Sequence, residues 1–339
     1  MTGRAERRLP AADVQAQSTT EGEAMTRKPP TALANSWHSV ICALLACVPL
    51  AAAVAQAESP YNAINAEAAS SPVTAHPVRG KISVLEGSGG NITVLTAPEG
   101  KFLVDGGIAV SRSKIEAALR GLGAGPVKYV VNTHWHWDHT DGNGWLKAAG
   151  ATMVAHPNTI RHLSETITVV EWGHTFTPVP AADLPTQSVS AKTTIALGGE
   201  SVQVEPFMPA HTDGDLFVYF PAEDVLATGD TFWNGLYPFI DYAAGGGING
   251  VIKAANANIA HAGPNTLVVP GHGPVGGRAE LIEYRDMLVA IRANVAALKG
   301  QGKSLDEVVA AKPTAAFDAK WGNAVISPAL FTALVYQGV

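Results

Sequence analysis

The feature that most constrains this 339-residue chain is a short segment in which histidines and an aspartate alternate with tryptophans. Residues 134–139 read HWHWDH. Imidazole nitrogens and carboxylate oxygens are the ligands that zinc and similar ions prefer in proteins. Tryptophan is rarely fully exposed, so its repeated occurrence here disfavours a simple histidine-rich surface loop. The segment therefore indicates a loop that binds metal.

The metal-binding loop lies between a predicted strand and a predicted helix. Residues 127–131 (VKYVV) are β-branched and apolar, as in a buried strand, and residues 141–149 read as a short helix. Alternate side chains of an extended loop project to the same side, so His134 and His136 are expected to point together. Asp138 and His139 come later in the bend, where they can face a second ion.

Three more residues of ligand type follow predicted strands farther along the chain. They are His211, Asp230 and His272, which come after residues 201–206, 225–228 and 267–269. Because each lies where a strand gives way to a loop, all three could converge at one edge of a sheet. Glycines next to Asp230 and His272 would let the backbone approach an ion closely.

The order of the predicted elements favours an α+β fold in one domain. Strands are expected at 81–85, 91–97, 101–105, 127–131, 152–155, 193–197, 201–206, 216–220, 225–228 and 267–269, and helices at 113–122, 141–149, 249–260 and 278–299. Residues 58–77 read as an irregular segment and residues 163–190 as a polar connection. Ser304 and Glu307 form a capping box that predicts one more helix. Two β-rich sheets packed face to face fit this order better than a doubly wound sheet, because hairpin-like runs open each half.

The N-terminal region resembles a secretory signal peptide. Residues 25–57 contain a small basic start, an apolar run and the sequence Ala55-Gln56-Ala57, which predicts cleavage before Glu58. The run is short for a membrane anchor, which is the alternative. Residues 1–24 read as an upstream extension of a chain that starts at Met25. The protein is therefore expected to be periplasmic or secreted.

The composition of the chain limits the kinds of molecule that it is expected to bind. Hydrophobic residues make up 47% of the chain and charged residues 15%, as in a globular protein, and the formal net charge is −6. An acidic chain disfavours nucleic acid, whose binding depends on Lys and Arg contacts to phosphate. Both cysteines, Cys42 and Cys47, lie in the predicted signal peptide, so no cysteine nucleophile is expected in the mature chain. We expect a small-molecule substrate and no stable membrane insertion after cleavage; the sequence leaves the oligomeric state open.

The motifs resemble those of the metallo-β-lactamase-fold superfamily of metallohydrolases. Over residues 78–280 the chain matches its pattern H-x-H-x-D-H followed by a distant His, Asp and His. The resemblance implies an αββα sandwich and two metal ions, usually zinc, with residues 281–339 as a helical extension packed on the same domain. It assigns His134, His136 and His211 to the first ion, Asp138, His139 and His272 to the second, and Asp230 as the bridge. It also gives Asp105 the role of supporting the metal loop.

The resemblance further implies hydrolysis. Two adjacent cations can bind one water and lower its pKa, and Asp138 is the expected catalytic residue that orients the resulting bridging hydroxide. The expected substrate is an ester, thioester, lactone or amide, with β-lactams included. Asp230 resembles the glyoxalase II, lactonase and phosphodiesterase branches, since β-lactamases of the fold usually carry cysteine or serine there. Trp233 and Tyr237 follow Asp230 and are candidate substrate contacts.

Two alternatives remain at this point. A mononuclear iron persulfide dioxygenase of the same fold would use His134, the geometry near His136, His211 and Asp230 around one metal, although secretion disfavours its mostly cytosolic thiol substrates. The second alternative is a non-catalytic periplasmic metal-binding protein, which the complete ligand set disfavours.

Overall fold

The computed structural model describes residues 59–87, 89–207 and 209–339. The predicted signal peptide, its cleavage site and the upstream extension lie outside these residues. Among the described helices, none has the length and apolar character needed to cross a bilayer.

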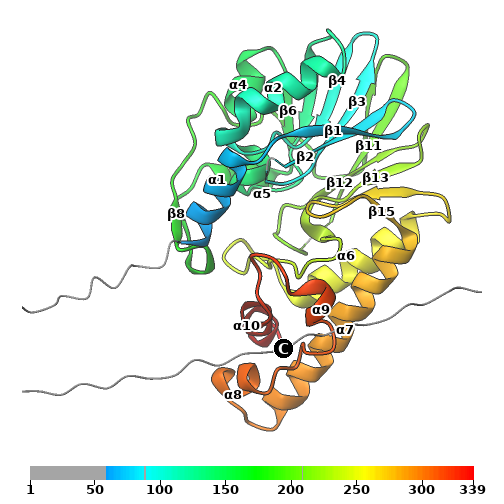
Figure 1. The fold of residues 1–339 in the computed structure, drawn as a ribbon. Coiled ribbons are helices and arrows are strands. Elements are labelled where there is room, and N and C mark those ends of the chain that lie inside the picture. Colours follow the sequence, from blue (N-terminus) through cyan, green and yellow to red (C-terminus); the bar gives the residue numbers. More distant parts are fainter. Residues whose placement is uncertain (1–58, 88, 208) are drawn as a thin grey trace, which may run out of the picture. The chain divides into compact units, whose positions relative to one another are not determined.

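Two β-sheets form the centre of the fold (Figure 1). The first contains, in spatial order, β1 (Thr74–Arg79), β2 (Ile82–Glu86), β3 (Ile92–Ala97), β4 (Gly100–Val104), β5 (Val127–Val131), β6 (Thr152–Ala155) and β9 (Gln187–Ser188). The second contains β10 (Thr193–Leu197), β11 (Glu200–Pro206), β12 (Leu216–Phe220), β13 (Val225–Ala227), β14 (Leu267–Val269) and β15 (Gly276–Gly277). A separate hairpin pairs β7 (Ile167–Val169) with β8 (His174–Phe176).

Helices cover the outer faces of both sheets. Against the first sheet lie α2 (Arg112–Gly121) and α4 (Asn143–Ala148), and against the second lie α6 (Ile248–His261) and α7 (Arg278–Gly300). The remaining helices are α1 (Pro60–Ser70), α3 (Trp137–Thr140), α5 (Pro157–Leu163), α8 (Leu305–Ala310), α9 (Asp318–Trp321) and α10 (Pro328–Gln337), with single 3-10 turns η1 (Ala109–Ser111), η2 (Val170–Trp172) and η3 (Gly229–Thr231). The predicted αββα sandwich is confirmed.

Alternation of side chains along the strands builds the sandwich. In β4, Phe102 and Val104 pack between the sheets, while Leu103 packs on the opposite face with α2 and α4. The ring of Phe102 meets that of Phe220 from β12 edge-on, with centroids 6.1 Å apart. Burying each such side chain stabilises the fold by about 1.5–3 kcal/mol. Burial on both faces explains why the central strands read as continuous apolar runs.

The N-terminal irregular segment predicted at 58–77 is wrong, because the chain forms α1 and β1 there. Helix α1 is rich in alanine and polar residues and has no apolar stripe, so periodicity does not reveal it. The available signal was Ser59, whose Oγ accepts a hydrogen bond from the backbone N–H of Asn62 at 3.3 Å, followed by Pro60 in the first turn. Tyr61 anchors the helix by stacking on His174 of β8, with ring centroids 3.6 Å apart.

Two other boundaries differ from expectation. The polar connection at 163–190 contains the β7–β8 hairpin and β9, whose strands are too short to show alternation. The helix predicted at 141–149 forms as α4, and the preceding α3 was not predicted, because it is a single turn within the metal loop. By contrast, β5 and β6 have the predicted bounds, and the capping box of α8 is confirmed, since the backbone N–H of Ser304 donates to Glu307 Oε2 at 2.8 Å.

The C-terminal helices depend on an aromatic stack beneath the second sheet. Phe331 of α10 is fully buried and stacks on Tyr237, with centroids 4.7 Å apart. We predict that Phe331→Ala lowers the free energy of unfolding by about 3–5 kcal/mol, because the cavity left behind adds to the lost burial. Urea denaturation measures the change.

A matched control is Val289→Ala on α7, because this valine is 44% exposed. Its substitution should change the unfolding free energy by no more than about 0.5 kcal/mol. Equal losses in both variants would contradict the packing role of Phe331.

Candidate metal centre

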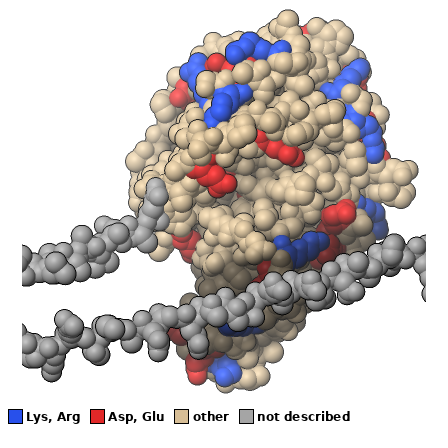
Figure 2. Space-filling model, in the orientation of Figure 1, with Lys and Arg blue, Asp and Glu red and all other residues tan. Residues whose placement is uncertain are grey.

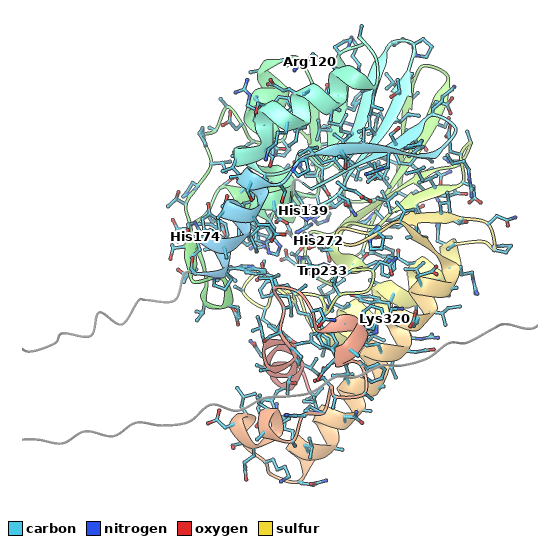
Figure 3. The ribbon with its side chains drawn as sticks, in the orientation of Figure 1. Arg120, His139, His174, Trp233, His272 and Lys320 are labelled. Atoms are coloured by element: carbon cyan, nitrogen blue, oxygen red, sulfur yellow. The ribbon has the colours of Figure 1, made fainter. Side chains whose placement is uncertain are left out.

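The seven ligand-type residues meet at one end of the sandwich, where strands β4, β5, β13 and β14 give way to loops. Figure 3 shows His139, His272 and Trp233 close together near the middle of the molecule. Strands β4 and β5 are parallel, as are β13 and β14, so the loops that follow each pair leave at the same edge. Residues distant in sequence therefore form two groups of metal-ligand type: His134, His136, His211 and Asp230, and Asp138, His139 and His272.

In the first group, three imidazole nitrogens face one another. His136 Nδ1 lies 3.1 Å from His134 Nε2 and 3.0 Å from His211 Nε2. Asp230 Oδ2 lies 3.5 Å from His211 Nε2. A tetrahedral ion with bonds of about 2.0–2.1 Å holds its ligand atoms about 3.3 Å apart. The spacing therefore suits an ion at their centre.

Hydrogen bonds on the far side of these rings fix which nitrogens face inward as acceptors. His211 Nδ1 donates to the carbonyl oxygen of Phe239 at 2.9 Å, and His136 Nε2 donates to Asp241 Oδ2 at 2.9 Å. Burial lowers the pKa of His211 to about 4, so this ring is neutral. In the neutral, metal-binding form of His136, lone pairs on His211 Nε2 and His136 Nδ1 then face each other at 3.0 Å. Such an arrangement is repulsive unless a cation lies between them.

In the second group, two imidazole nitrogens and one carboxylate oxygen lie close together. His139 Nε2 lies 3.5 Å from Asp138 Oδ2 and 3.4 Å from His272 Nε2, and His272 Nε2 lies 3.3 Å from Asp138 Oδ2. Burial opposes a charge on His272, but Asp230 and Asp138 outweigh it and raise the pKa of this ring to about 9. The carboxylates thus attract a cation, and a bound metal would displace the proton.

Asp230 lies between the two groups. Its Oδ1 is 3.1 Å from His139 Nε2, and its Oδ2 is 3.4 Å from His272 Nε2 and 3.8 Å from His134 Nε2. Oδ1 is buried and has no hydrogen bond within the described structure. A buried carboxylate oxygen without a donor is costly, and a metal ion would satisfy it.

Two aspartates outside the ligand set, Asp105 and Asp241, each support one part of the metal loop through hydrogen bonds. Asp105 Oδ2 accepts hydrogen bonds from His139 Nδ1 and from Thr133 Oγ1, both at 2.8 Å, and Asp105 Oδ1 accepts the backbone N–H of Thr133. Asp241 holds His136 and also accepts from Trp135 Nε1 at 3.0 Å. The resemblance predicts this role for Asp105, whereas Asp241 is not predicted, because no local motif marks it.

Glycine is required where the backbone passes the ligands. A Cβ atom at Gly271 would lie 1.9 Å from Asp230 Oδ1, and one at Gly90 would lie 2.2 Å from His139 Cε1. The backbone next to His272 therefore approaches the Asp230 carboxylate closely, as only glycine allows.

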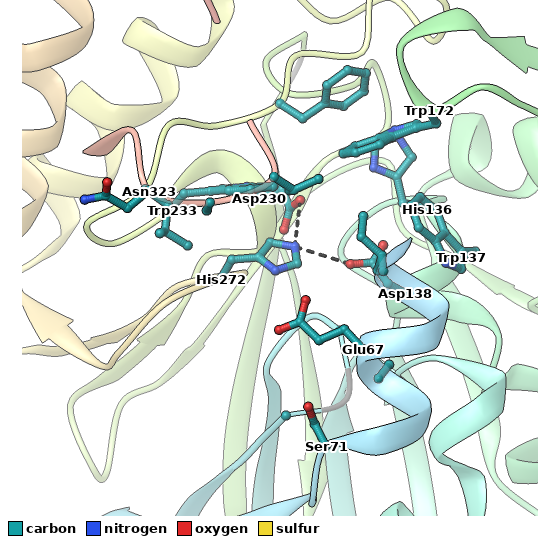
Figure 4. Close-up of a pocket in the computed structure, with 18 residues that line it drawn as sticks. Glu67, Ser71, His136, Trp137, Asp138, Trp172, Asp230, Trp233, His272 and Asn323 are labelled. Carbon is teal, nitrogen blue, oxygen red and sulfur yellow. Dashed lines mark ion pairs between the residues drawn. The ribbon is translucent and has the colours of Figure 1, made fainter. Parts of the chain in front are cut away.

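A cavity of about 380 Å³ opens over the two groups (Figure 4). His136, Asp138, Asp230 and His272 line its inner end. Its walls are mostly apolar and come from α1, α3, the η2 turn between β7 and β8, the loop after β13 and the segment before α10: Ile64, Ala68, Trp137, Trp172, Trp233, Leu236, Phe239, Ala324 and Val325.

The two aromatic residues predicted to contact substrate have different positions. Trp233 lines the cavity, with its ring 4.1 Å from that of His272. Tyr237 is fully buried under Phe331, and its hydroxyl donates to Asp318 Oδ1 at 2.9 Å. The assignment of Tyr237 to the substrate is therefore corrected: it is a packing residue that joins the second sheet to the C-terminal helices.

Substitution of Asp241 tests whether its hydrogen bond to His136 supports metal binding. We predict that Asp241→Asn weakens metal affinity by about 10–100-fold, as is typical when the hydrogen-bond partner of a ligating histidine is changed. An amide can present its NH₂ group to His136 and so favours the wrong tautomer. Competition with a chromophoric chelator measures the affinity. Unchanged affinity in a folded variant would show that Asp241 only packs.

Comparison with known proteins identifies the family. The model described as metallo-beta-lactamase superfamily matches residues 85–287. The linear primary-alkylsulfatase of Pseudomonas sp. (strain ATCC 19151) is 24% identical over 256 residues, which are 64% of this chain and 48% of that protein. The chain spans about half the length of the alkylsulfatases that it matches.

Two solved structures show the same fold. The stereoselective inverting sec-alkylsulfatase from Pseudomonas sp. aligns with a TM-score of 0.60 at 17% identity, over 78% of this chain and 50% of that one. The metallo-beta-lactamase from Pontibacter korlensis aligns with a TM-score of 0.50 at 21% identity, over 64% of this chain and 98% of that one. With the family model matching well over half of the sequence, this chain belongs to the metallo-beta-lactamase superfamily.

Proposed function

We propose that this chain is a binuclear zinc hydrolase that cleaves an ester, thioester, lactone or amide bond. The observation that carries the proposal is the convergence of two ligand groups on Asp230 at the inner end of a mostly apolar cavity. Nitrogen and carboxylate ligands suit zinc, and Asp230, whose Oδ1 faces His139 and whose Oδ2 faces His211, suits a shared position.

The residues of the site would have different roles in such a reaction. When bound, two ions would lower the pKa of water and polarise the scissile group. Asp138 lies at the boundary between the second group and the cavity, so its carboxylate can orient a water and accept its proton. Asp105 and Asp241 hold the rings of His139 and His136, which keeps the ligand nitrogens directed inward. The aromatic walls exclude water from the substrate.

Alkyl sulfate hydrolysis is a second candidate. It is supported by similarity to the linear primary-alkylsulfatase and the sec-alkylsulfatase. A sulfate ester is anionic, however, and no Lys or Arg of the described chain lines the cavity. Carbonyl substrates without a negative charge fit this lining better.

We also infer that the enzyme is exported to the periplasm or secreted. The support is the basic start, apolar run and Ala55-Gln56-Ala57 sequence within residues 25–57.

Metal content tests the shared carboxylate. We predict that the wild-type chain retains two equivalents of zinc after dialysis against a weak chelator. Asp230→Ala should retain at most one, because both ions then lack the anion that offsets their mutual repulsion. The exposed Asp286→Ala on α7 is the control and should retain both. A wild type with one metal, held equally well by Asp230→Ala, would refute the bridge.

Turnover tests the chemistry. A panel of a carboxyl ester, a lactone, a thioester, a β-lactam and an alkyl sulfate should show hydrolysis of a carbonyl substrate that is lost on chelation and restored by zinc. Asp138→Asn, reloaded with zinc, should lower kcat by several orders of magnitude, since acid–base catalysis alone contributes about 10²–10⁴-fold.

Other outcomes of the panel would overturn the proposal. Turnover of the alkyl sulfate alone would favour the second candidate. Oxygen-dependent turnover of a persulfide with one iron per chain would favour a dioxygenase. Metal binding without any turnover would favour a non-catalytic role.

A further inference from the structure

A single acidic side chain lies at the mouth of the cavity. Glu67 of α1 is exposed and is one of the residues that line the cavity. Figure 4 shows its carboxylate directed from α1 toward the space beside His272 and Asp138. Its backbone carbonyl accepts hydrogen bonds from Ser70 Oγ and the Ser71 N–H, but its carboxylate has no hydrogen bond or ion pair with any other described residue.

The position of Glu67 is not one that stabilises its helix. It lies in the last turn of α1, where the helix dipole disfavours a negative charge. An i,i+4 partner that could offset this charge is also missing, since position 71 is Ser and position 63 is Ala. Helix stability therefore does not account for a glutamate here.

Part of the cavity wall is aromatic. Trp137 and Trp172 meet edge-on with ring centroids 5.6 Å apart, and Trp172 contacts Phe239 at 4.5 Å. Trp233 adds a further ring beside His272. Aromatic faces attract ammonium groups, and several together form the usual recognition site for quaternary ammonium ligands.

Basic side chains are missing from the described lining of the cavity, since none of these residues is Lys or Arg. On the face shown in Figure 2, most blue side chains lie toward the upper and right margins, and one lies below the middle beside a red one. A negatively charged substrate would therefore meet a carboxylate at the mouth, with no compensating cation outside the metal site.

We propose that the substrate of this cavity carries a positively charged ammonium group, which Glu67 and the aromatic wall recognise while the scissile bond lies at the metal groups. This inference rests on the proposed function, because it names the substrate class of that same site. Glu67 is a specificity-determining residue. Its negative charge favours a cationic substrate over anionic esters such as the alkyl sulfates for which the relatives are named.

Binding of matched probes tests the inference without turnover. Hexyltrimethylammonium and hexyl sulfate share an alkyl chain and differ in the sign of the headgroup. Each is titrated into the zinc-loaded full chain, and quenching of tryptophan fluorescence is followed. The ammonium probe should bind more tightly than the sulfate. Glu67→Gln should weaken it by about three- to tenfold, and Glu67→Lys should reverse the preference.

The control is Glu165→Gln, an exposed glutamate outside the cavity lining that produces the same change in net charge. It should leave both affinities unchanged, and zinc content should be the same in all three variants. Tighter binding of hexyl sulfate, no binding of the ammonium probe, or equal ammonium affinity in wild type and Glu67→Gln would overturn the inference. Loss of zinc in Glu67→Gln would do so too, because Glu67 would then serve the ions.

Activity separates this inference from the proposed function. If the chain cleaves carboxyl esters, a choline ester should have a lower KM than a neutral ester of equal size, and Glu67→Gln should raise that KM with kcat nearly unchanged. Ester hydrolysis without this preference would reject the ammonium site and keep the hydrolase. Ammonium binding without any hydrolysis would reject the hydrolase and keep the ligand class.

Discussion

The structure of this protein depends on hydrogen-bond acceptor atoms that are held close together in the buried metal centre. In the neutral, metal-binding forms of His136 and His211, their lone pairs face each other at 3.0 Å, and buried Asp230 Oδ1 lies against His139 Nε2 at 3.1 Å without a well-directed hydrogen bond. Groups of this kind repel one another in the absence of a cation. Surrounding hydrogen bonds and packing must therefore hold these groups in place. The αββα sandwich supplies both.

The supports come from parallel pairs of strands in two different sheets. Strand β4 delivers Asp105 beside the loop after β5, and β13 and β14 deliver Asp230 and His272 from the facing sheet. Glycine at position 271 lets the two loops of the second sheet pass within contact distance of the Asp230 carboxylate. A site built this way requires both sheets to be packed, so metal affinity and folding are coupled.

The cavity above the metal groups is assembled from parts that lie outside the sandwich. Helix α1, the loop after β13 and the segment before α10 each contribute to its wall. Helix α1 supplies the only acidic side chain at the mouth within the described cavity lining, apart from the ligand-type aspartates. The core fold therefore sets the chemistry, while these peripheral segments set which substrates reach it, as is usual for functional loops on a rigid scaffold.

The sequence by itself determined the fold class and the ligand-type residues, because local patterns carry them. The apolar run at 127–131 and the spacing of residues 134–139 are properties of neighbouring positions. It could not reveal Asp241, 105 positions from the ring it holds, nor the helix at Pro60–Ser70, which has no apolar stripe. Nor could it separate Trp233, at the cavity, from Tyr237, four residues later in the core. Only tertiary structure decided these points, since burial and hydrogen-bond partners depend on which distant segments pack together.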